Sequence, residues 1–341
     1  MRVNREELLR SLSLVGPGLA TREVVEQSAS FCFTGGKVMT FNDEIACSVA
    51  CPLAIEGAVA AAPMVALLSK LTEAEVDINI KGEQLIVAGT GKRSGLPMQA
   101  QVVLPIDTVD APEEDGWAAL DGGFCEAMDL VVQCVSGSDE RFDLTCVHIQ
   151  PDYVEACDSY QFSRYPIATG VSEACLVRGK SVKNIVGLGM NAIAETASWL
   201  HFRNASGLVM SCRKWAEAYP DFTCLMDWEG VQTVLPGGLA EMAAKAEIFS
   251  SDNFEGNHVQ ISLLPNQLRI KGKGPTGWYE ERCPIKYDGT PLEFLIAPKL
   301  LASLTGKSQE CEVTEGKLRI NTGKATYIAC LLVAEDALAV A

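Results

Sequence analysis

The sequence predicts an α+β protein made of three repeated units, each with two helices and antiparallel sheets. A chain of 341 residues is too long for one ordinary core, and three equal units of about 114 residues would each match the usual domain size. The last third, from Asn257 to Val333, reads as strands, a short helix and a further hairpin. The same order of patterns occurs twice more upstream, which indicates a repeat architecture.

Alternating apolar and polar residues predict the strands of the last third. The alternation runs through residues 258–263 and 267–271, on either side of a turn at Leu264-Pro265-Asn266. A short apolar-periodic helix begins at Ala297-Pro298, and a second hairpin turns at Glu315-Gly316. The expected order is three strands, a helix and two strands.

The first third begins with a short amphipathic helix. Asn4 is a suitable N-cap for residues 5–12, and Gly16-Pro17-Gly18 ends the helix. A second helix begins at Ala62-Pro63, because proline is tolerated best in the first turn. The strands are expected at 30–34, 37–41, 44–49, 76–80 and 84–87.

The first and last thirds correspond in detail. Ala62-Pro63 matches Ala297-Pro298, and the distance from proline to the next hairpin glycine is 19 residues in one (Gly82) and 18 in the other (Gly316). Such agreement favours a true repeat over coincidence.

The middle third follows the same order less regularly. Helices are expected from residue 123 and over 179–186, and strands at 144–149 and 153–157. Its closing hairpin, at 199–202 and 208–212, comes late, which indicates about nine residues inserted at 187–197. With acidic linkers at 107–116 and 227–230, the predicted domains are residues 1–112, 113–228 and 229–341.

Composition excludes several functional classes. A net charge of −16 argues against a protein that grips nucleic acid with its whole surface, but it allows a local basic track. No stretch of about 18 apolar residues and no signal peptide is recognisable, so we expect a soluble, cytoplasmic protein with no membrane partner. Thirteen scattered cysteines and three histidines favour buried reduced thiols, with no disulfide framework, no metal site and no cofactor.

Three such units favour a ring. Each unit offers sheet edges to its neighbours and lays two helices on one face, so side-by-side repetition forms an arc or a ring. A ring of six units requires two chains joined head to tail, which cyclic symmetry closes without loose edges. The expected assembly is a homodimer.

Four stretches occur in order along the chain: Leu8-Leu9 followed by Arg22, the segment 141–162, Tyr219-Pro220-Asp221-Phe222 and the strand 325–332. With these stretches and the triple repeat, the chain resembles the bacterial-type beta sliding clamp, the processivity factor of replicative DNA polymerase. The resemblance covers nearly the whole length, and its divergence favours a phage-encoded or otherwise remote member. It implies three clamp domains, a head-to-tail ring around duplex DNA of any sequence, and no enzymatic activity. It also implies partners, the replicative polymerase and the clamp loader, that dock through short linear motifs.

In this family the paired helices line the hole and carry the positive charge. Isolated lysines on helices are ordinarily solvated surface, yet here the second helix of every repeat carries one despite the acidic total. Arg22 matches a DNA-contacting arginine of the family. The residues expected to face DNA are Arg5, Arg10, Arg22, Lys70, Arg178, Lys180, Lys183, Lys245, Lys299 and Lys307.

The family's partner site is an apolar pocket between its second and third domains. Where the family typically has Gly-His-Arg-Leu, this chain has Ser159-Tyr160-Gln161-Phe162, so the preferred motif is expected to differ. Residues 334–341 either cover the pocket or form a plain tail. The pocket residues implied are Leu144, Cys157, Ser159, Tyr160, Gln161, Phe162, Pro220, Leu225, Ile328 and Cys330.

Two other readings stay open. One is a clamp-like peptide-binding scaffold or decoy that does not encircle DNA, and the other is a hydrolase that uses a cysteine. The segment Gly89–Ser94 lacks the glycine spacing of a phosphate-binding loop. His148 and His258 lie at nearly corresponding strand positions in two repeats, so they are interpreted as a structural feature of the repeat and not as a catalytic pair. The paired carboxylates Glu280 and Glu281 are assigned to a turn-rich, solvated loop.

Overall fold

The computed structural model describes residues 1–250 and 258–333. Six α-helices and 25 β-strands lie in these residues, which confirms the α+β class. The chain forms two compact units. The first contains Met1–Val132, Cys146–Val154 and Ile167–Glu217, and the second contains Gln133–Thr145, Glu155–Pro166 and Ala218–Ala341. The middle third contributes to both units, so the predicted boundaries 1–112, 113–228 and 229–341 stay a prediction.

One order of elements occurs three times along the chain: a strand, a helix, four strands, a helix and three strands. The first repeat comprises β1 (Arg2–Asn4), α1 (Arg5–Leu14), β2 (Ser30–Thr34), β3 (Lys37–Phe41), β4 (Ile45–Ala50), β5 (Gly57–Ala60), α2 (Ala61–Lys70), β6 (Glu75–Lys81), β7 (Gln84–Gly89) and β8 (Lys92–Gln99). The middle repeat comprises β9 (Ala118–Ala119), α3 (Phe124–Val131), β10 (Cys146–Ile149), β11 (Tyr153–Cys157), β12 (Gln161–Pro166), β13 (Cys175–Arg178), α4 (Gly179–Gly187), β14 (Met190–Glu195), β15 (Trp199–Asn204) and β16 (Val209–Arg213). The third comprises β17 (Val231–Val234), α5 (Leu239–Glu247), β18 (Val259–Leu264), β19 (Gln267–Gly274), β20 (Gly277–Pro284), β21 (Leu292–Ile296), α6 (Pro298–Lys307), β22 (Glu310–Thr314), β23 (Lys317–Asn321) and β24 (Thr326–Cys330), and β25 (Leu332–Val333) follows it.

The predicted insertion in the middle repeat is wrong. Residues 187–197 contain β14, which pairs with β15 as β6 pairs with β7. The turn between β14 and β15, at residues 196–198, contains no glycine, so its hairpin was not recognisable. All three repeats therefore have three strands after their second helix.

Local sequence fixes the helix ends. The Asn4 side chain accepts hydrogen bonds from the backbone N–H groups of Glu6 and Glu7, each at 3.0 Å, which satisfies two unpaired donors of α1. Leu8 and Leu12 of this helix are buried, and a 3₁₀ turn at Gly16–Gly18 follows it. The predicted first helix is confirmed.

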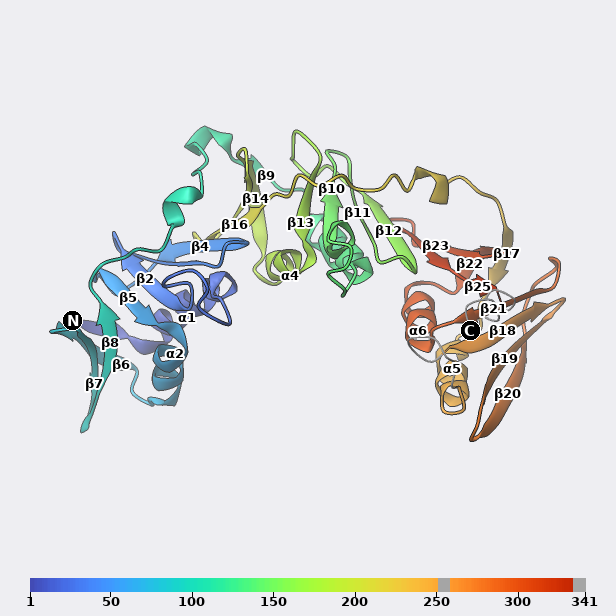
Figure 1. The fold of residues 1–341 in the computed structure, drawn as a ribbon, viewed down its shortest axis with the longest axis horizontal. Coiled ribbons are helices and arrows are strands. Elements are labelled where there is room, and N and C mark those ends of the chain that lie inside the picture. Colours follow the sequence, from blue (N-terminus) through green and yellow to red (C-terminus); the bar gives the residue numbers. More distant parts are fainter. Residues whose placement is uncertain (251–257, 334–341) are drawn as a thin grey trace. The chain divides into compact units, whose positions relative to one another are not determined.

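In each repeat the two helices pack against each other. Figure 1 shows α5 and α6 side by side, and α5 also contacts β18, β19 and β20. Gly272 of β19 is required at this contact, because a Cβ atom there would lie 1.9 Å from the carbonyl oxygen of Ala246.

The sheets repeat the same strand order. The first repeat contains β5-β2-β3-β4 and β1-β6-β7-β8, and the third contains β21-β18-β19-β20 and β17-β22-β23-β24. The middle repeat shows the order β9-β14-β15-β16. Two equivalent joints connect repeats: β4 pairs with β16 in the first compact unit, and β12 pairs with β24 in the second. We call these the first and the second joint.

Among the strands equivalent to those of the two joints, two have an unpaired edge in the described part of the chain. The strand β20, equivalent to β4 and β12, ends its sheet. The strand β8, equivalent to β16 and β24, pairs with β5 only at Met98 and Gln99, so its earlier residues have β7 as their sole partner. Glu280 and Glu281 lie on β20, so their assignment to a loop is wrong.

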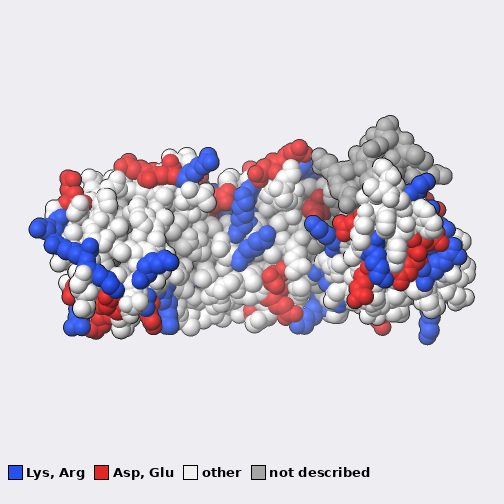
Figure 2. Space-filling model, turned by 90° about the horizontal axis from the view of Figure 1, so that it is seen from below, with Lys and Arg blue, Asp and Glu red and all other residues white. Residues whose placement is uncertain are grey.

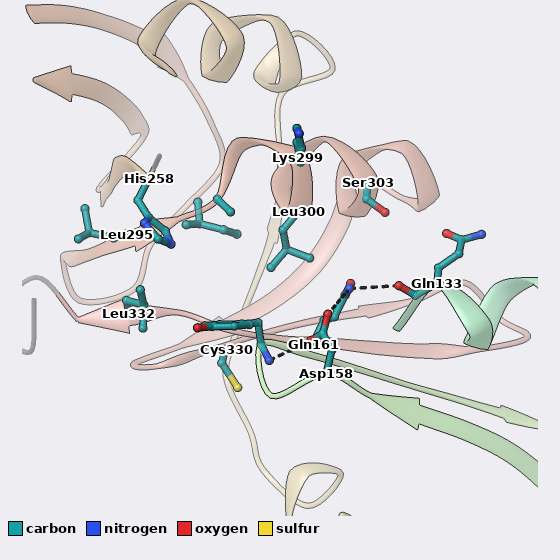
Figure 3. Close-up of a pocket in the computed structure, with 13 residues that line it drawn as sticks. Gln133, Asp158, Gln161, His258, Leu295, Lys299, Leu300, Ser303, Cys330 and Leu332 are labelled. Carbon is teal, nitrogen blue, oxygen red and sulfur yellow. Dashed lines mark hydrogen bonds between the residues drawn. The ribbon is translucent and has the colours of Figure 1, made fainter. Parts of the chain in front are cut away.

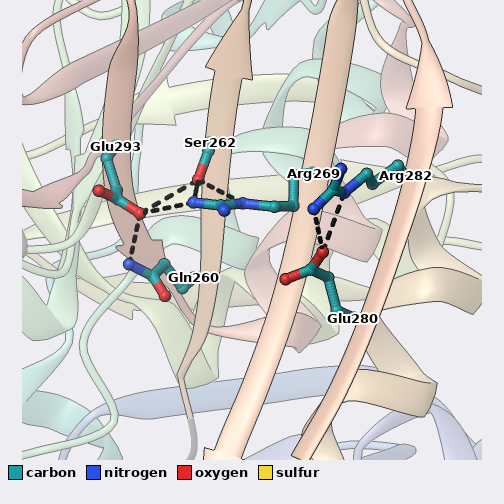
Figure 4. Close-up of polar contacts among 6 residues, drawn as sticks. All are labelled: Gln260, Ser262, Arg269, Glu280, Arg282 and Glu293. Atoms are coloured by element: carbon teal, nitrogen blue, oxygen red, sulfur yellow. Dashed lines mark hydrogen bonds and ion pairs between the residues drawn. The ribbon is translucent and has the colours of Figure 1, made fainter.

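A polar ladder crosses the sheet that ends in β20 (Figure 4). Arg269 donates to the Ser262 hydroxyl at 3.0 Å and lies 3.3 Å from the Glu293 carboxylate, and these residues face each other across β19, β18 and β21. On β20 itself, Arg282 pairs with Glu280 at 2.6 Å. Cross-strand pairs of this kind hold register and keep this face of the sheet solvated.

Candidate functional site

The second joint carries an apolar cluster that we call the closed compartment. Leu144, Cys157, Phe162 and Ile328 are each at most 5% exposed, and Phe162 lies directly opposite Ile328 in the ladder between β12 and β24. Four half-buried connector residues pack against them: Tyr219, Phe222, Leu225 and Met226. The cluster therefore joins two strands from different repeats to the connector that links those repeats.

Aromatic contacts cover this compartment. The ring centroid of Phe222 lies 5.5 Å from that of Phe162, and it also lies 5.5 Å from that of Tyr219 with the two planes at 75°. The Tyr219–Phe222 pair has the favourable edge-to-face geometry, and the Phe162–Phe222 pair is tilted at 49°. The chain's own aromatic side chains thus occupy the space above Phe162.

The connector is fastened at its far end by a charged pair. Arg319 donates to the carbonyl oxygens of Met226 (2.9 Å) and Trp228 (3.0 Å), and its guanidinium lies 4.5 Å from the Trp228 ring centroid. Glu312 pairs with Arg319 and accepts a hydrogen bond from the backbone N–H of Gly230 at 2.6 Å. Because both side chains are largely buried, each depends on the other for its charge compensation.

Beside the closed compartment lies an open one of about 710 Å³ (Figure 3). Its apolar wall comes from β21, α6 and β25 and includes Leu295, Ile296, Leu300 and Leu332. The other side carries Tyr160, which is 58% exposed, and Cys330. Its polar groups include Gln133, Asp158, Gln161, His258 and Ser303. An apolar cavity of this size with a few polar groups is typical of ligand sites.

The turn between β11 and β12 presents Tyr160 to the open compartment. Asp158 holds the turn, because one of its carboxylate oxygens accepts from the backbone N–H groups of Tyr160 (3.0 Å) and Gln161 (2.9 Å). Ser159 has φ of 80°, a left-handed conformation in which glycine is unstrained. Ser159 is therefore a residue under backbone strain.

The ten predicted pocket residues divide between these features. Leu144, Cys157, Phe162, Leu225 and Ile328 belong to the closed compartment. Tyr160, Gln161 and Cys330 line the open one, Ser159 lies in the turn beside it, and Pro220 lies half-buried between Tyr219 and Asp221. The wall formed by α6 and β25 was not predicted, although the helix α6 was, because periodicity does not show which helix face borders a cavity. The predicted tail, 334–341, lies outside the described residues.

Burial makes the thiols near this site poor nucleophiles. It raises the pKa of Cys157 to about 11 and that of Cys134 to about 12, and it also raises the pKa of Cys330. A protonated thiol is neither a nucleophile nor a metal ligand. Within residues 1–250 and 258–333, no group of three or more His, Cys, Asp or Glu residues is placed to hold a metal.

Two of the ten residues expected to face DNA are engaged in the fold. Arg178 is buried, 3.8 Å from Glu44. Arg5 donates to the carbonyl oxygens of Glu73 (2.9 Å) and Leu68 (3.3 Å), and so ties α1 to the end of α2. Both guanidiniums are largely buried and bonded within the fold, so their DNA-facing role stays a prediction that these contacts do not favour.

The remaining basic residues differ in their freedom. Lys245 pairs with Glu281 at 3.1 Å, and Lys307 donates to the Gln133 side chain at 2.9 Å. Lys299 contributes to the lining of the open compartment, but in Figure 3 it extends from α6 away from Gln161 and Asp158. The exposed members of the set are Arg10, Arg22, Lys70, Lys180, Lys183, Lys245 and Lys299.

The helices are more basic than the rest of the chain. The six described helices carry eight Lys or Arg and six Asp or Glu, whereas the whole chain has 28 and 44. On the face drawn in Figure 2, basic and acidic side chains are interspersed. Weak, distributed contacts with phosphate fit this pattern better than one strong site. No described helix is long and apolar enough to cross a membrane.

Comparisons with known proteins agree on the fold. No protein-family model and no curated sequence matches the chain. The DNA polymerase sliding clamp of Pseudomonas aeruginosa superposes with a TM-score of 0.83 at 15% identity, covering 97% of this chain and 99% of that one. The sliding clamp of Bartonella birtlesii, bound to griselimycin, gives 0.85 at 14% identity over 97% and 98%, and that of Bacillus subtilis gives 0.82 at 16% over the same shares. The chain therefore has the three-domain fold of these clamps, at a sequence distance that shows the fold alone.

Proposed function

We propose that this protein, which has the sliding-clamp fold, is a DNA sliding clamp that confers processivity. Two copies join head to tail in a ring that encircles duplex DNA, and the ring tethers the replicative DNA polymerase. The observation that supports this best is the clamp fold over 97% of the chain. The role needs no catalytic residue and no cofactor, and it belongs to the cytoplasm.

The two joints supply a rule for the contact between copies. The first residue of β16, Val209, pairs with the fourth residue of β4, Ser48, and the first residue of β24, Thr326, pairs with the fourth of β12, Arg164. By the same rule β8 of one copy pairs with β20 of the other, and Lys92 faces Glu280. Closing both free edges in this way is the form that cyclic symmetry favours.

Side-chain chemistry at these edges supports the pairing. Trp278 of β20 is 68% exposed, which is unusual for a large aromatic residue on an edge strand. The register places Trp278 opposite Ser94 and the carboxylate of Glu280 opposite the ammonium of Lys92. Burial of an aromatic residue together with opposite charges is typical of a specific interface.

The exposed helix residues Arg10, Lys70, Lys180, Lys183, Lys245 and Lys299, with Arg22, are the proposed contacts to DNA. Contacts to phosphate carry no sequence information, and a small number of them lets a ring slide. The acidic remainder of the surface disfavours binding elsewhere.

The open and closed compartments form the proposed docking site for the polymerase and the clamp loader. The open compartment accepts apolar side chains of a short linear motif without any rearrangement. The closed one accepts a second side chain only after Phe222 moves, because the Phe222 ring packs on Phe162. Recognition by apolar anchors in preformed pockets is a common mode of peptide binding.

The experiment is a processivity assay on primed circular DNA with the cognate polymerase and loader. The protein is expected to lengthen the products at a fixed polymerase concentration. Tyr160→Ala combined with Leu300→Gln is expected to abolish the effect, whereas Lys37→Gln, at the exposed first residue of β3, is expected to leave it unchanged. Equal product lengths with and without the protein would contradict the proposal.

A second candidate is a peptide-binding scaffold or decoy that does not encircle DNA. It is favoured by α3, which carries Glu126 and Asp129 and no basic residue, and by α5, which is more acidic than basic. A chain that stays monomeric in sedimentation at micromolar concentration would select this candidate over the ring.

A further inference from the structure

The two joints between repeats are filled differently. Because they share one register, Ala46 opposite Ser211 in the first joint takes the place of Phe162 opposite Ile328 in the second. The second joint is packed by this large pair together with Phe222. The first joint has two small side chains at the equivalent positions, and its connector, residues 106–112, contains no aromatic residue.

The missing volume appears as a cavity of about 150 Å³ in the first compact unit. Its floor is formed by Ala46, Cys47, His201 and Ser211, which are all buried. The connector residues Ile106, Val109, Ala111 and Pro112 cover it, and Met39, Ser48 and Val209 complete the walls. An engineered, enclosed cavity of about 150 Å³ accepts benzene, so this pocket, which is partly open to solvent, has room for one aromatic ring.

One end of the cavity is polar. The Nδ1 atom of His201 lies 2.7 Å from the Ser211 hydroxyl, and its Nε2 atom lies 3.0 Å from the Thr196 hydroxyl. The Thr196 hydroxyl donates to the Trp199 carbonyl, so it accepts from Nε2–H, and Nδ1 then accepts the Ser211 proton. Ser211 is left with a free lone pair and no proton to donate, so this end of the cavity accepts a hydrogen bond.

We infer that the first joint holds a binding site for a phenol-sized aromatic group with one hydrogen-bond donor. The ring lies among the apolar walls, and its O–H or N–H group donates to Ser211. No lysine or arginine lines the cavity, so it does not suit an anion. A free small molecule and the tyrosine side chain of a partner peptide share this chemistry.

The test is an NMR titration of the full ¹⁵N-labelled chain with phenol, benzene and N-acetyltyrosinamide. Phenol is expected to shift the amides of Ala46 and Ser211 in a saturable way, with Kd below about 5 mM, and benzene to bind at least about threefold more weakly. If N-acetyltyrosinamide shifts the same amides, the site takes a tyrosine of a peptide, and if only phenol does, it takes a free small molecule. The absence of a saturable shift with phenol would overturn the inference.

Three variants separate this site from binding elsewhere. Val109→Phe fills the cavity from its roof and is expected to abolish the phenol shifts. Val103→Phe is the matched control, because Val103 is an exposed residue three positions before this connector and does not line the cavity. Ser211→Ala keeps the cavity and is expected to reduce phenol binding to the level of benzene. Phenol binding that persists unchanged in a folded Val109→Phe variant would refute the assignment, whatever the outcome of the DNA experiments.

Discussion

Replacing Trp278 with alanine is expected to weaken the proposed dimer severely. A tryptophan exposes up to about 250 Å², so the side chain, at 68% exposure, offers about 170 Å² to a partner. If half of this area is buried against β8 of the second copy, each contact loses about 2 kcal/mol at about 25 cal/mol per Å². A ring contains two such contacts, so the loss is about 4 kcal/mol and Kd rises by about 1,000-fold.

Sedimentation velocity over a concentration series measures this effect in the full chain. Val24→Ala is the matched control, because Val24 is also an exposed apolar residue but lies far from β20 in the sequence. Glu280→Lys is expected to weaken the dimer as well, and adding Lys92→Glu is expected to restore part of the loss through the reversed pair. A Kd that does not change in Trp278→Ala would refute the β8–β20 pairing.

Three further outcomes are expected. Lys180→Glu with Lys183→Glu should weaken the affinity for DNA of any sequence and reduce the salt dependence of that affinity. The control Lys37→Glu with Lys81→Glu, on strands, should change the affinity little, and fluorescence anisotropy measures both. In urea titrations, Arg319→Met should lower the free energy of unfolding by about 3–5 kcal/mol, because it leaves Glu312 buried without its partner. The control Arg282→Met breaks an exposed ion pair and should lower it by less than about 1 kcal/mol. Burial lowers the pKa of His201 to about 4 in the folded chain, so the unfolded chain binds a proton at a higher pH. The free energy of unfolding should therefore fall by about 3 kcal/mol as the pH drops from 6.5 to 4, and His201→Gln should flatten this pH dependence.

Each of these three predictions would be contradicted by one specific result. Equal loss of DNA binding in the helix and strand variants would remove the helices as the DNA-facing surface. An Arg319→Met variant as stable as the parent would show that the connector is held by its aromatic contacts alone. An unfolding free energy with the same pH dependence in the parent and His201→Gln would mean that other groups govern acid stability.

Local signals were sufficient where one residue type fixes a conformation. The Asn4 cap, the prolines at 63 and 298 and the glycines at 82 and 316 placed helices and hairpins correctly, because each acts through its own backbone. The hairpin between β14 and β15 was missed because its turn, at 196–198, uses no such residue. Propensity thus located the repeat but not every strand of it.

Tertiary contacts decided the rest. Arg5 and Arg178 are basic residues at helix starts, as expected for a DNA-facing surface. In the structure Arg5 donates to the backbone just after α2, and Arg178 is buried beside Glu44. Phe222 belongs to a segment that carries the family resemblance, but its packing on Phe162 depends on a connector that Arg319 holds in place. No periodicity encodes such contacts between distant segments.

Retention on DNA tests the central claim most directly. The protein is loaded by its cognate loader onto a nicked circular plasmid, and the complex is passed through a gel-filtration column before and after a single restriction cut. A ring that encircles DNA stays with the circle and is lost from the linear product, because it slides off the ends. Loss from both forms, or equal retention on both, would contradict encirclement.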